Sequence, residues 1–377
     1  SSSLWLQAGV VVPDHVARGA MQRAVGTAVD DGGSSDDAEL GNASEDDLKE
    51  QNEPLPPNVY GWAVSMMIRD IVWIEHGTRL TVERAARIAN SLGIIAATTS
   101  MQAFLLWAVQ RLICRKAVEN IRAQYGAYEL LMYPNRTEKT LNGYDRGLPG
   151  YRQDERFWLM EDEVAKKVCE IPLAHPYYLA AVLLIWTFTC QVEVRTIVET
   201  CYRLIIKTPT VRSMDMVLDS GDEHEVHVQG LTLPLKIAIG VFIQLPRFVT
   251  VVALLWLGCR WLLATIGLGD VLLNGLALEF LVLLKDLFYN ACISHRNRLE
   301  TESLFVRPFR EVNKASWVTF FSGQMWGALS IAFVFGYIFF WQSVLPDYRW
   351  DVADLCRDYT NGVEGPPSSS LAGGRHR

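Results

Sequence analysis

Apolar stretches of helix length recur along the chain and are separated by polar segments. A helix needs about 20 residues to cross a hydrocarbon core of about 30 Å. The pattern therefore predicts an all-α, polytopic membrane protein with about five transmembrane helices. The predicted spans are residues 93–113, 177–198, 247–265, 271–292 and 317–342.

The segments around these spans differ in composition. Residues 1–57 are acidic and rich in Gly, Ser and Pro, which is typical of a disordered tail. Residues 58–92 mix apolar and charged positions, so they are expected to form amphipathic juxtamembrane helices on a membrane surface. The transmembrane domain, 93–345, contains one large polar loop, 115–175. The C-terminal tail, 346–377, is acidic and then of low complexity.

The fourth span contains a carboxylate near its middle, Glu279. An acid at mid-depth costs about 2.5–3.5 kcal/mol on insertion scales, so it should face protein or water. At 100° per residue, Glu279 shares one helical stripe with Gly275, Asp286 and Asn290. Lys285, Asp270 and, in the third span, Arg247 are the other candidate intramembrane polar residues.

Two interpretations of this stripe remain open. It lines a path for ions or protons, or it makes a structural hydrogen bond between helices. A third possibility comes from TIGLGD, residues 265–270, which matches the T-x-G-x-G-D pattern of potassium-channel filters. A glycine-rich hairpin turn capped by Asp270 explains the same residues.

The distribution of basic residues predicts the orientation. The loop after the fourth span contains Arg296, Arg298 and Lys314 among others, and the positive-inside rule assigns such a loop to the cytosol. Five spans then give a cytosolic N-terminus and an outer C-terminus, and the glycosylation sequon at Asn135 falls outside, as glycosylation requires. The sequence does not identify the membrane.

One group of residues opposes this orientation. Four basic residues follow the first span on the predicted outer side, and they outnumber the basic residues before it. These four are Arg111, Arg115, Lys116 and Arg122. Long loops follow the rule poorly, so the orientation is kept.

The same topology places Cys169 and Cys356 on one oxidising side, in two different outer segments. We therefore expect these two cysteines to form a disulfide. The last span has glycines at 323 and 327, a spacing that is typical of tight helix contacts.

Composition excludes several classes. Hydrophobic residues make up 50% of the chain, but the mean hydropathy is only +0.12, so apolar segments are diluted by polar ones. The net charge of −7 argues against a nucleic-acid partner. No enzyme, metal or dinucleotide motif is present, so no catalytic residue, metal or cofactor is expected.

Four short stretches resemble a large group of uncharacterised protist multi-span membrane proteins. They are Trp186–Thr189, Asp270–Asn274, Ala277–Phe280 and Gln342–Tyr348. The resemblance implies the multi-span architecture and no particular activity.

The leading hypothesis from the sequence is a channel-like or transporter-like protein whose polar stripe lies on the fourth span. The alternative is a non-catalytic membrane scaffold or assembly protein, and a potassium-type channel is a minor alternative. The expected partners are the lipid bilayer and further copies of the chain.

Overall fold

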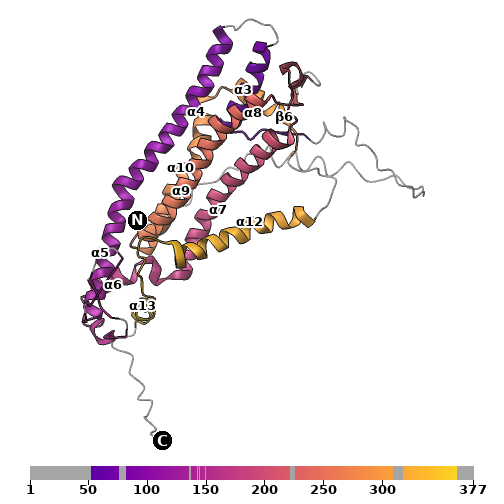
Figure 1. Cartoon of the computed structure of the whole chain (residues 1–377). Helices are drawn as coiled ribbons and strands as arrows, with labels where there is room; N and C mark the ends of the chain where they lie inside the picture. The colour runs from indigo at the N-terminus through magenta and orange to yellow at the C-terminus, as the bar shows by residue number, and fades with distance from the viewer. Residues whose placement is uncertain are drawn as a thin grey trace, which may run out of the picture. The chain divides into compact units, whose positions relative to one another are not determined.

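A computed structural model describes residues 52–75, 82–135, 137–141, 143, 145–148, 150–220, 226–308 and 317–362. The predicted tail up to residue 51 and the end of the C-terminal tail lie outside these ranges. As predicted, the chain is mostly helical (Figure 1).

The α-helices are α3 (Val59–Glu75), α4 (Val82–Ala108), α5 (Arg115–Met132), α6 (Asp162–Cys169), α7 (Pro176–Cys201), α8 (Leu233–Ala238), α9 (Leu245–Ala264), α10 (Leu268–Cys292), α11 (His295–Glu302), α12 (Trp317–Gly336) and α13 (Val352–Thr360). Four π-helical segments extend or join them: η1 (Val109–Cys114), η4 (Tyr202–Lys207), η6 (Ile239–Gln244) and η7 (Tyr337–Trp341). Short 3₁₀ turns are η2 (Asp154–Arg156), η3 (Pro172–Ala174) and η5 (Met214–Met216).

A small sheet brings together three segments that are far apart in the sequence. Its strands are β1 (Glu53–Pro54), β4 (Leu218–Ser220), β5 (Val226–Val228) and β6 (Leu304–Val306), in the order β1-β6-β5-β4. β6 pairs antiparallel with β1 and parallel with β5. A separate hairpin consists of β2 (Glu138–Lys139) and β3 (Asp145–Arg146).

Arg203, at the end of the helix that contains α7 and η4, fixes this sheet. Its Nη2 donates to the carbonyl of Glu53 at 2.8 Å, and its Nε donates to the carbonyl of Arg307 at 3.0 Å. The N-terminal segment, the connector after η4 and the loop after α10 therefore meet at one end of the helices. This is the grouping that the predicted topology assigns to one side.

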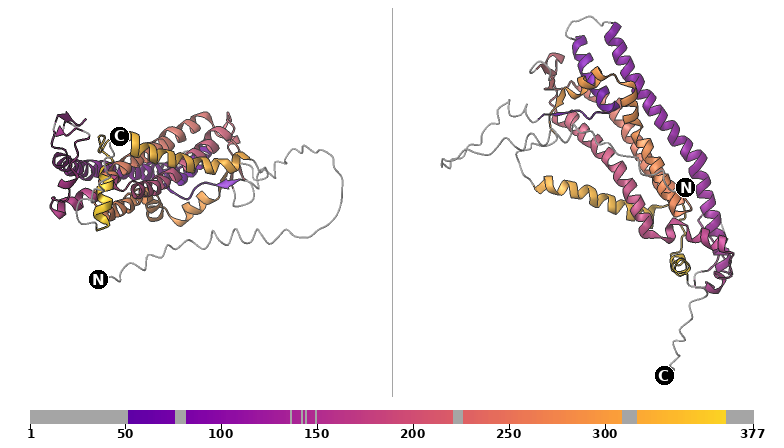
Figure 2. Two further views of the ribbon diagram at one scale, coloured as in Figure 1. Left: turned by 90° about the horizontal axis from the view of Figure 1, so that it is seen from below. Right: turned by 180° about the vertical axis from the view of Figure 1, so that it is seen from behind.

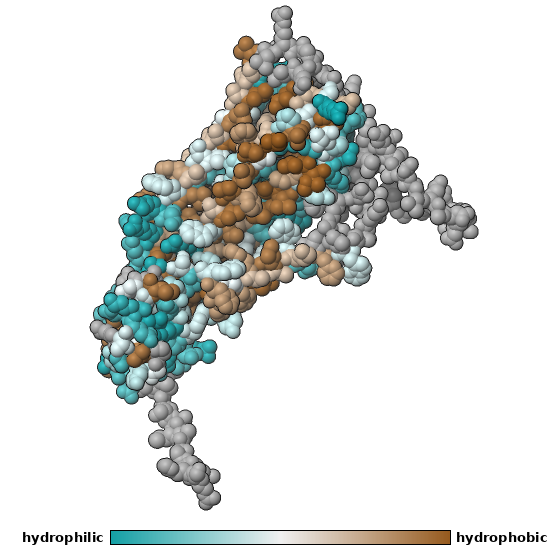
Figure 3. Space-filling model, viewed as in Figure 1, coloured by the Kyte–Doolittle hydropathy of each residue, from teal (hydrophilic) through white to brown (hydrophobic). Residues whose placement is uncertain are grey.

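Among the described residues, four helices are long and apolar enough to span a membrane: Val82–Met132, Pro176–Lys207, Leu233–Ala264 and Gly323–Trp341. They overlap four of the five predicted spans. The remaining predicted span, residues 271–292, lies in α10. This helix is not apolar enough to count as a membrane span, because every 18-residue stretch of it contains Glu279, Lys285 and at least one further charged residue. Figure 3 shows hydrophobic residues over the middle of the helices and hydrophilic ones at the end that carries α5 and α6.

The prediction of surface helices for residues 58–92 is wrong for α3. Trp62, Ala63, Met66 and Ile68 are at most 2% exposed, and α3 packs against α4, α10 and α11. α3 is apolar around most of its circumference, which is typical of a buried helix. Residues 82–92 belong to the long helix that begins at Val82 and continues through η1 and α5.

The predicted third span starts at Arg247, directly after Pro246, but the helix does not begin there. The helix runs without interruption from Leu233 to Ala264, and η6 ends two residues before the proline. Proline lacks an N–H and crowds the preceding turn, and a π segment absorbs both effects.

α12 contacts α7 near η7 and diverges from it toward Trp317 (Figures 1 and 2). A Cβ added at Gly323 or Gly327 would meet nothing within 4 Å, so the predicted tight contact is not made by the described residues. The close helix contact is elsewhere, because Gly258 of α9 lies directly against the indole of Trp186 in α7.

Both predicted tails are shorter than expected. Residues 53–54 form β1, and Leu55 is 2% exposed. At the other end, α13 buries Val352 and Leu355 against the core. Burial of these apolar side chains outweighs the acidic composition around them. In the predicted outer loop, residues 115–132 form α5.

Candidate functional site

A buried polar cluster lies where five helices meet. Each helix contributes one side chain: Tyr60 from α3, Gln102 from α4, Glu193 from α7, Arg247 from α9 and Lys285 from α10. All five are at most 8% exposed. The cluster is therefore an internal feature of the bundle.

Glu193 is the centre of the cluster. Its Oε2 lies 2.9 Å from Nη2 of Arg247, and its Oε1 accepts a hydrogen bond from Nζ of Lys285. Lys285 also lies 3.4 Å from Oδ2 of Asp286, which is half-buried. Two cations and two carboxylates thus neutralise one another, as buried charges require.

Tyr60 and Gln102 close the other side of the cluster. The guanidinium of Arg247 lies 4.9 Å from the centre of the Tyr60 ring. The Tyr60 hydroxyl donates to Oε1 of Gln102 at 3.2 Å, and Nε2 of Gln102 donates to the carbonyl of Leu281 at 3.4 Å. These contacts bind α3 and α4 to the cluster.

The space inside the cluster is small. The cavity that these side chains line measures about 10 Å³. A single water molecule needs at least about 10–15 Å³ of this kind. Nε and Nη1 of Arg247 are buried and have no hydrogen-bond partner among the described residues. The cluster is thus a closed ionic junction with two donors left over.

The sequence analysis did not select Glu193, which precedes the charged residues Arg195 and Glu199 in the more polar second half of α7. A signal was available. Glu193 follows Trp186 by seven residues and Cys190 by three, and it precedes Ile197 by four, so all four share one helical stripe. In the structure all four are buried.

The structure brings together three of the predicted polar residues, Arg247, Lys285 and Asp286, around Glu193. It does not bring Glu279, Asn290 or Asp270 to this cluster, and all three are exposed. Glu279 makes no hydrogen bond or ion pair with any described residue. It lies on a face of α10 that also exposes apolar side chains, among them Leu272, Leu276, Phe280 and Leu283.

The TIGLGD stretch forms a turn and the first turn of α10. Gly267 has φ +99°, and its carbonyl accepts from the N–H of Val271 at 3.1 Å. Residues from Leu268 onward are helical. A filter needs several successive carbonyls aimed at one ion, whereas here they are directed along the helix.

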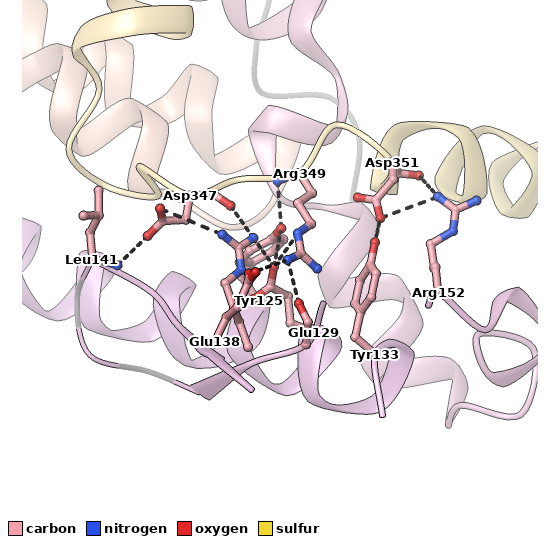
Figure 4. A network of polar contacts seen from close by, with 11 residues as sticks. Tyr125, Glu129, Tyr133, Glu138, Leu141, Arg152, Asp347, Arg349 and Asp351 are labelled. Carbon is pink, nitrogen blue, oxygen red and sulfur yellow. Dashed lines mark hydrogen bonds and ion pairs between the residues drawn. The ribbon is translucent and has the colours of Figure 1, made fainter. Parts of the chain in front are cut away.

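A second polar network ties the C-terminal segment to α5 and the β2–β3 hairpin (Figure 4). Glu129, 1% exposed, accepts from Nη2 of Arg146 at 2.6 Å and lies 3.7 Å from Nε of Arg349. The Tyr133 hydroxyl donates to Asp351, and burial together with this bond raises the pKa of Tyr133 to about 12. The network lies in a lobe at one end of the helices, which is built from the described residues of 133–175 and 342–362 and is called the α6–α13 lobe below.

The disulfide expected from the sequence is present in this lobe. Cys169 at the end of α6 is bonded to Cys356 in α13, and their Cα atoms lie 5.2 Å apart. Asn135, the predicted glycosylation site, is exposed in the same lobe. The outer loop and the C-terminal segment therefore lie at the same end of the helices.

The chain was compared with known protein families, curated proteins and solved structures, and no match was found. The fold and the cluster alone define the class: a mostly helical protein whose described residues include four helices able to span a membrane, with an ionic junction between α3, α4, α7, α9 and α10.

Proposed function

We propose that the chain is a multi-pass integral membrane protein that acts as a scaffold and not as a channel. The observation that carries the proposal is the contrast between two acids. Glu193 is enclosed and neutralised by Arg247 and Lys285, whereas Glu279 is exposed on an apolar face and has no partner among the described residues. The polar core is complete without Glu279.

Glu279 is the proposed contact with another membrane helix. A carboxylate that faces lipid costs about 2.5–3.5 kcal/mol on insertion scales, and a donor on a neighbouring helix removes this cost. A second copy of the chain is the simplest source of such a helix. In this proposal α10 also spans the membrane, as the fourth of five spans, and it tolerates its charges because Lys285 and Asp286 are directed into the bundle.

The experiment compares Glu279→Leu with the wild type in native electrophoresis and mass measurement. We expect Glu279→Leu to reduce the assembled species while the monomer stays as stable as the wild type or more stable. Asn290→Leu, also exposed on α10, is the matched control and should assemble normally. Equal assembly of Glu279→Leu and wild type contradicts the proposal.

Ion transport is the second candidate. The two unpartnered nitrogens of Arg247 beside a cavity favour it, because they provide donors for an anion or water if the bundle opens. Reconstituted protein is assayed for flux of several ions. The scaffold proposal expects no flux above empty liposomes, and a flux that Glu193→Gln or Glu279→Gln changes would replace it with transport.

The proposed orientation has the N-terminus in the cytosol and the C-terminus outside. It is supported by the β1-β6-β5-β4 sheet at one end of the helices and the α6–α13 lobe at the other, because they separate the segments that the topology assigns to opposite sides. Membrane-impermeant maleimide should label Glu163→Cys, on α6, in intact cells. Arg296→Cys, on α11, is tested together with Cys292→Ser, which removes the exposed native thiol, and should react only after permeabilisation; the reverse pattern inverts the topology. Both wild-type side chains are exposed.

A further inference from the structure

Three of the four basic residues that oppose the positive-inside rule, Arg111, Arg115 and Arg122, line one cavity. A partly open cavity of about 290 Å³ is lined by Arg111, Arg115, Arg122 and Arg260, with Gln110 and Glu119. Four positive charges and one negative charge leave a net charge of +3 on its wall. Arg260 comes from α9, so the cavity lies between two helices.

The cavity has donors and an acceptor that the protein itself does not use. Nε of Arg260 and Oε1 of Gln110 are buried and have no hydrogen-bond partner among the described residues. Among the residues that the structure describes, no carboxylate lies within ion-pair distance of Arg111. Glu119 is engaged by Arg115 at 3.0 Å, so it does not neutralise the other arginines.

Other contacts hold the arginines in place. The Arg260 guanidinium lies 5.4 Å from the centre of the Trp256 ring. Arg122 donates to the carbonyls of Ser343 and Val344 at 2.7 and 2.8 Å. Arg111 and Gln110 lie on η1, a π-helical segment, and such segments occur frequently at functional sites. The wall of the cavity is thus preorganised before any ligand binds.

The ends of three apolar helices lie near this cavity. Arg111 lies at the end of the first predicted span, and Arg260 lies about one turn before the end of α9 at Ala264. Ser343 follows η7, which ends at Trp341. In a membrane this is the headgroup layer, where basic pockets between helices bind lipid phosphates.

Exposed apolar side chains lie next to the arginines. Leu112 and Ile113 on η1 are 57% and 44% exposed, and Trp256 is 49% exposed. A soluble anion would make no favourable contact with these apolar side chains, whereas the acyl chains of a lipid would pack against them. We propose that this cavity is a binding site for the phosphate headgroup of an anionic phospholipid.

The arrangement accounts for the exception in the charge distribution. Arginine binds phosphate through a planar fork of donors, and each charge-assisted hydrogen bond is stronger than a neutral one. The basic residues at the outer end of the first span therefore serve lipid binding, and they do not report the orientation of that span. This inference needs insertion into a membrane but not the scaffold role.

The test uses the full chain in detergent micelles. Binding of phosphatidic acid, phosphatidylglycerol and phosphatidylcholine is measured by native mass spectrometry and by the shift in thermal unfolding. We expect the two anionic lipids to bind and phosphatidylcholine not to bind. Arg260→Gln and Arg111→Gln should each weaken anionic lipid binding about tenfold.

Lys116→Gln is the matched control, because it removes the same charge next to Arg115 but does not line the cavity. It should change binding less than about twofold. Arg111 is exposed, so Arg111→Gln keeps the test valid if Arg260→Gln fails to fold.

Equal binding of phosphatidylcholine, or equal effects of Lys116→Gln and Arg111→Gln, overturns the proposal. Binding of inorganic phosphate is measured as well, in competition with the lipids. If it binds as tightly as the lipids and displaces them, the cavity takes a soluble anion and the lipid assignment is wrong.

Discussion

Arg247 of α9 and Glu193 of α7 form an ion pair with a nitrogen–oxygen distance of 2.9 Å, although the two residues are only 2% and 8% exposed. Lys285 of α10 bonds to the other oxygen of the same carboxylate. Three helices therefore share one negative charge. The cost of burying these charges is offset only while all of them are present.

Glu193→Gln is expected to destabilise the bundle by about 3–5 kcal/mol, because it leaves two cations without their shared carboxylate. Thermal unfolding in detergent micelles, followed by tryptophan fluorescence, measures the change. Glu199→Gln is the matched control, since Glu199 lies on the same helix in an exposed pair with Arg195. Its effect should stay within about 1 kcal/mol. Similar losses in the two variants would show that the junction is not a stabilising element.

Gly258→Val is expected to destabilise the α7–α9 contact by about 1–3 kcal/mol or more, because the new side chain would overlap the Trp186 indole. The same unfolding assay applies. Gly327→Val provides the control in α12, where a Cβ would meet nothing within 4 Å. A large effect at Gly327 and none at Gly258 would mean that α12, and not α9, makes the close helix contact.

Thiol counting tests the disulfide. Under denaturing conditions without reductant, alkylation should modify the five free cysteines, and after reduction it should modify all seven. Cys292, the exposed free cysteine among them, should react even in the folded protein. Loss of the bond through Cys356→Ser should lower stability by about 2–5 kcal/mol. Seven modified cysteines without reduction would exclude the bond.

The pH dependence of the α6–α13 lobe follows from Tyr133. Burial, and then the hydrogen bond to Asp351, raise the pKa of Tyr133 in the folded protein to about 12, from about 10 in an unfolded chain. The neutral phenol therefore stabilises the fold fully below about pH 10, and this contribution is lost as the pH rises toward 12.

Tyr133→Phe should consequently be most destabilising below about pH 10, and its difference from the wild type should shrink at higher pH. Unfolding temperatures between pH 8 and about 11.5 measure this difference. Tyr177→Phe is the control, because Tyr177 is 86% exposed. A difference that stays constant over the whole range would mean that Tyr133 does not titrate with the fold.

Hydropathy and periodicity predicted the positions of the long helices, because an apolar run of about 20 residues has few structural alternatives. They also grouped the segments that meet at each end. The sequence did not show how α10 is rotated about its own axis. Periodicity shows that Glu279 and Asp286 share a stripe, but not which neighbouring helices cover it.

α3 shows a second limit of the sequence. Arg69 and Asp70 made it look amphipathic, whereas both have partners inside the protein. Nη2 of Arg69 donates to the hydroxyl of Ser303 at 3.0 Å, and Asp70 lies 3.7 Å from Nε of Arg87. Partners of this kind, more than 200 residues away in one case, cannot be recognised from local pattern.

The position of β6 between β1 and β5 has a consequence for biosynthesis. β1 contains residues 53–54, but its partner strand begins only at residue 304. During translation, β1 therefore has no partner strand until α4, α7, α9 and α10 have been synthesised. Cys356, the disulfide partner of Cys169, is synthesised later still. Both ends of the bundle are therefore completed last, and a ribosome that stops before residue 304 releases helices with neither end closed.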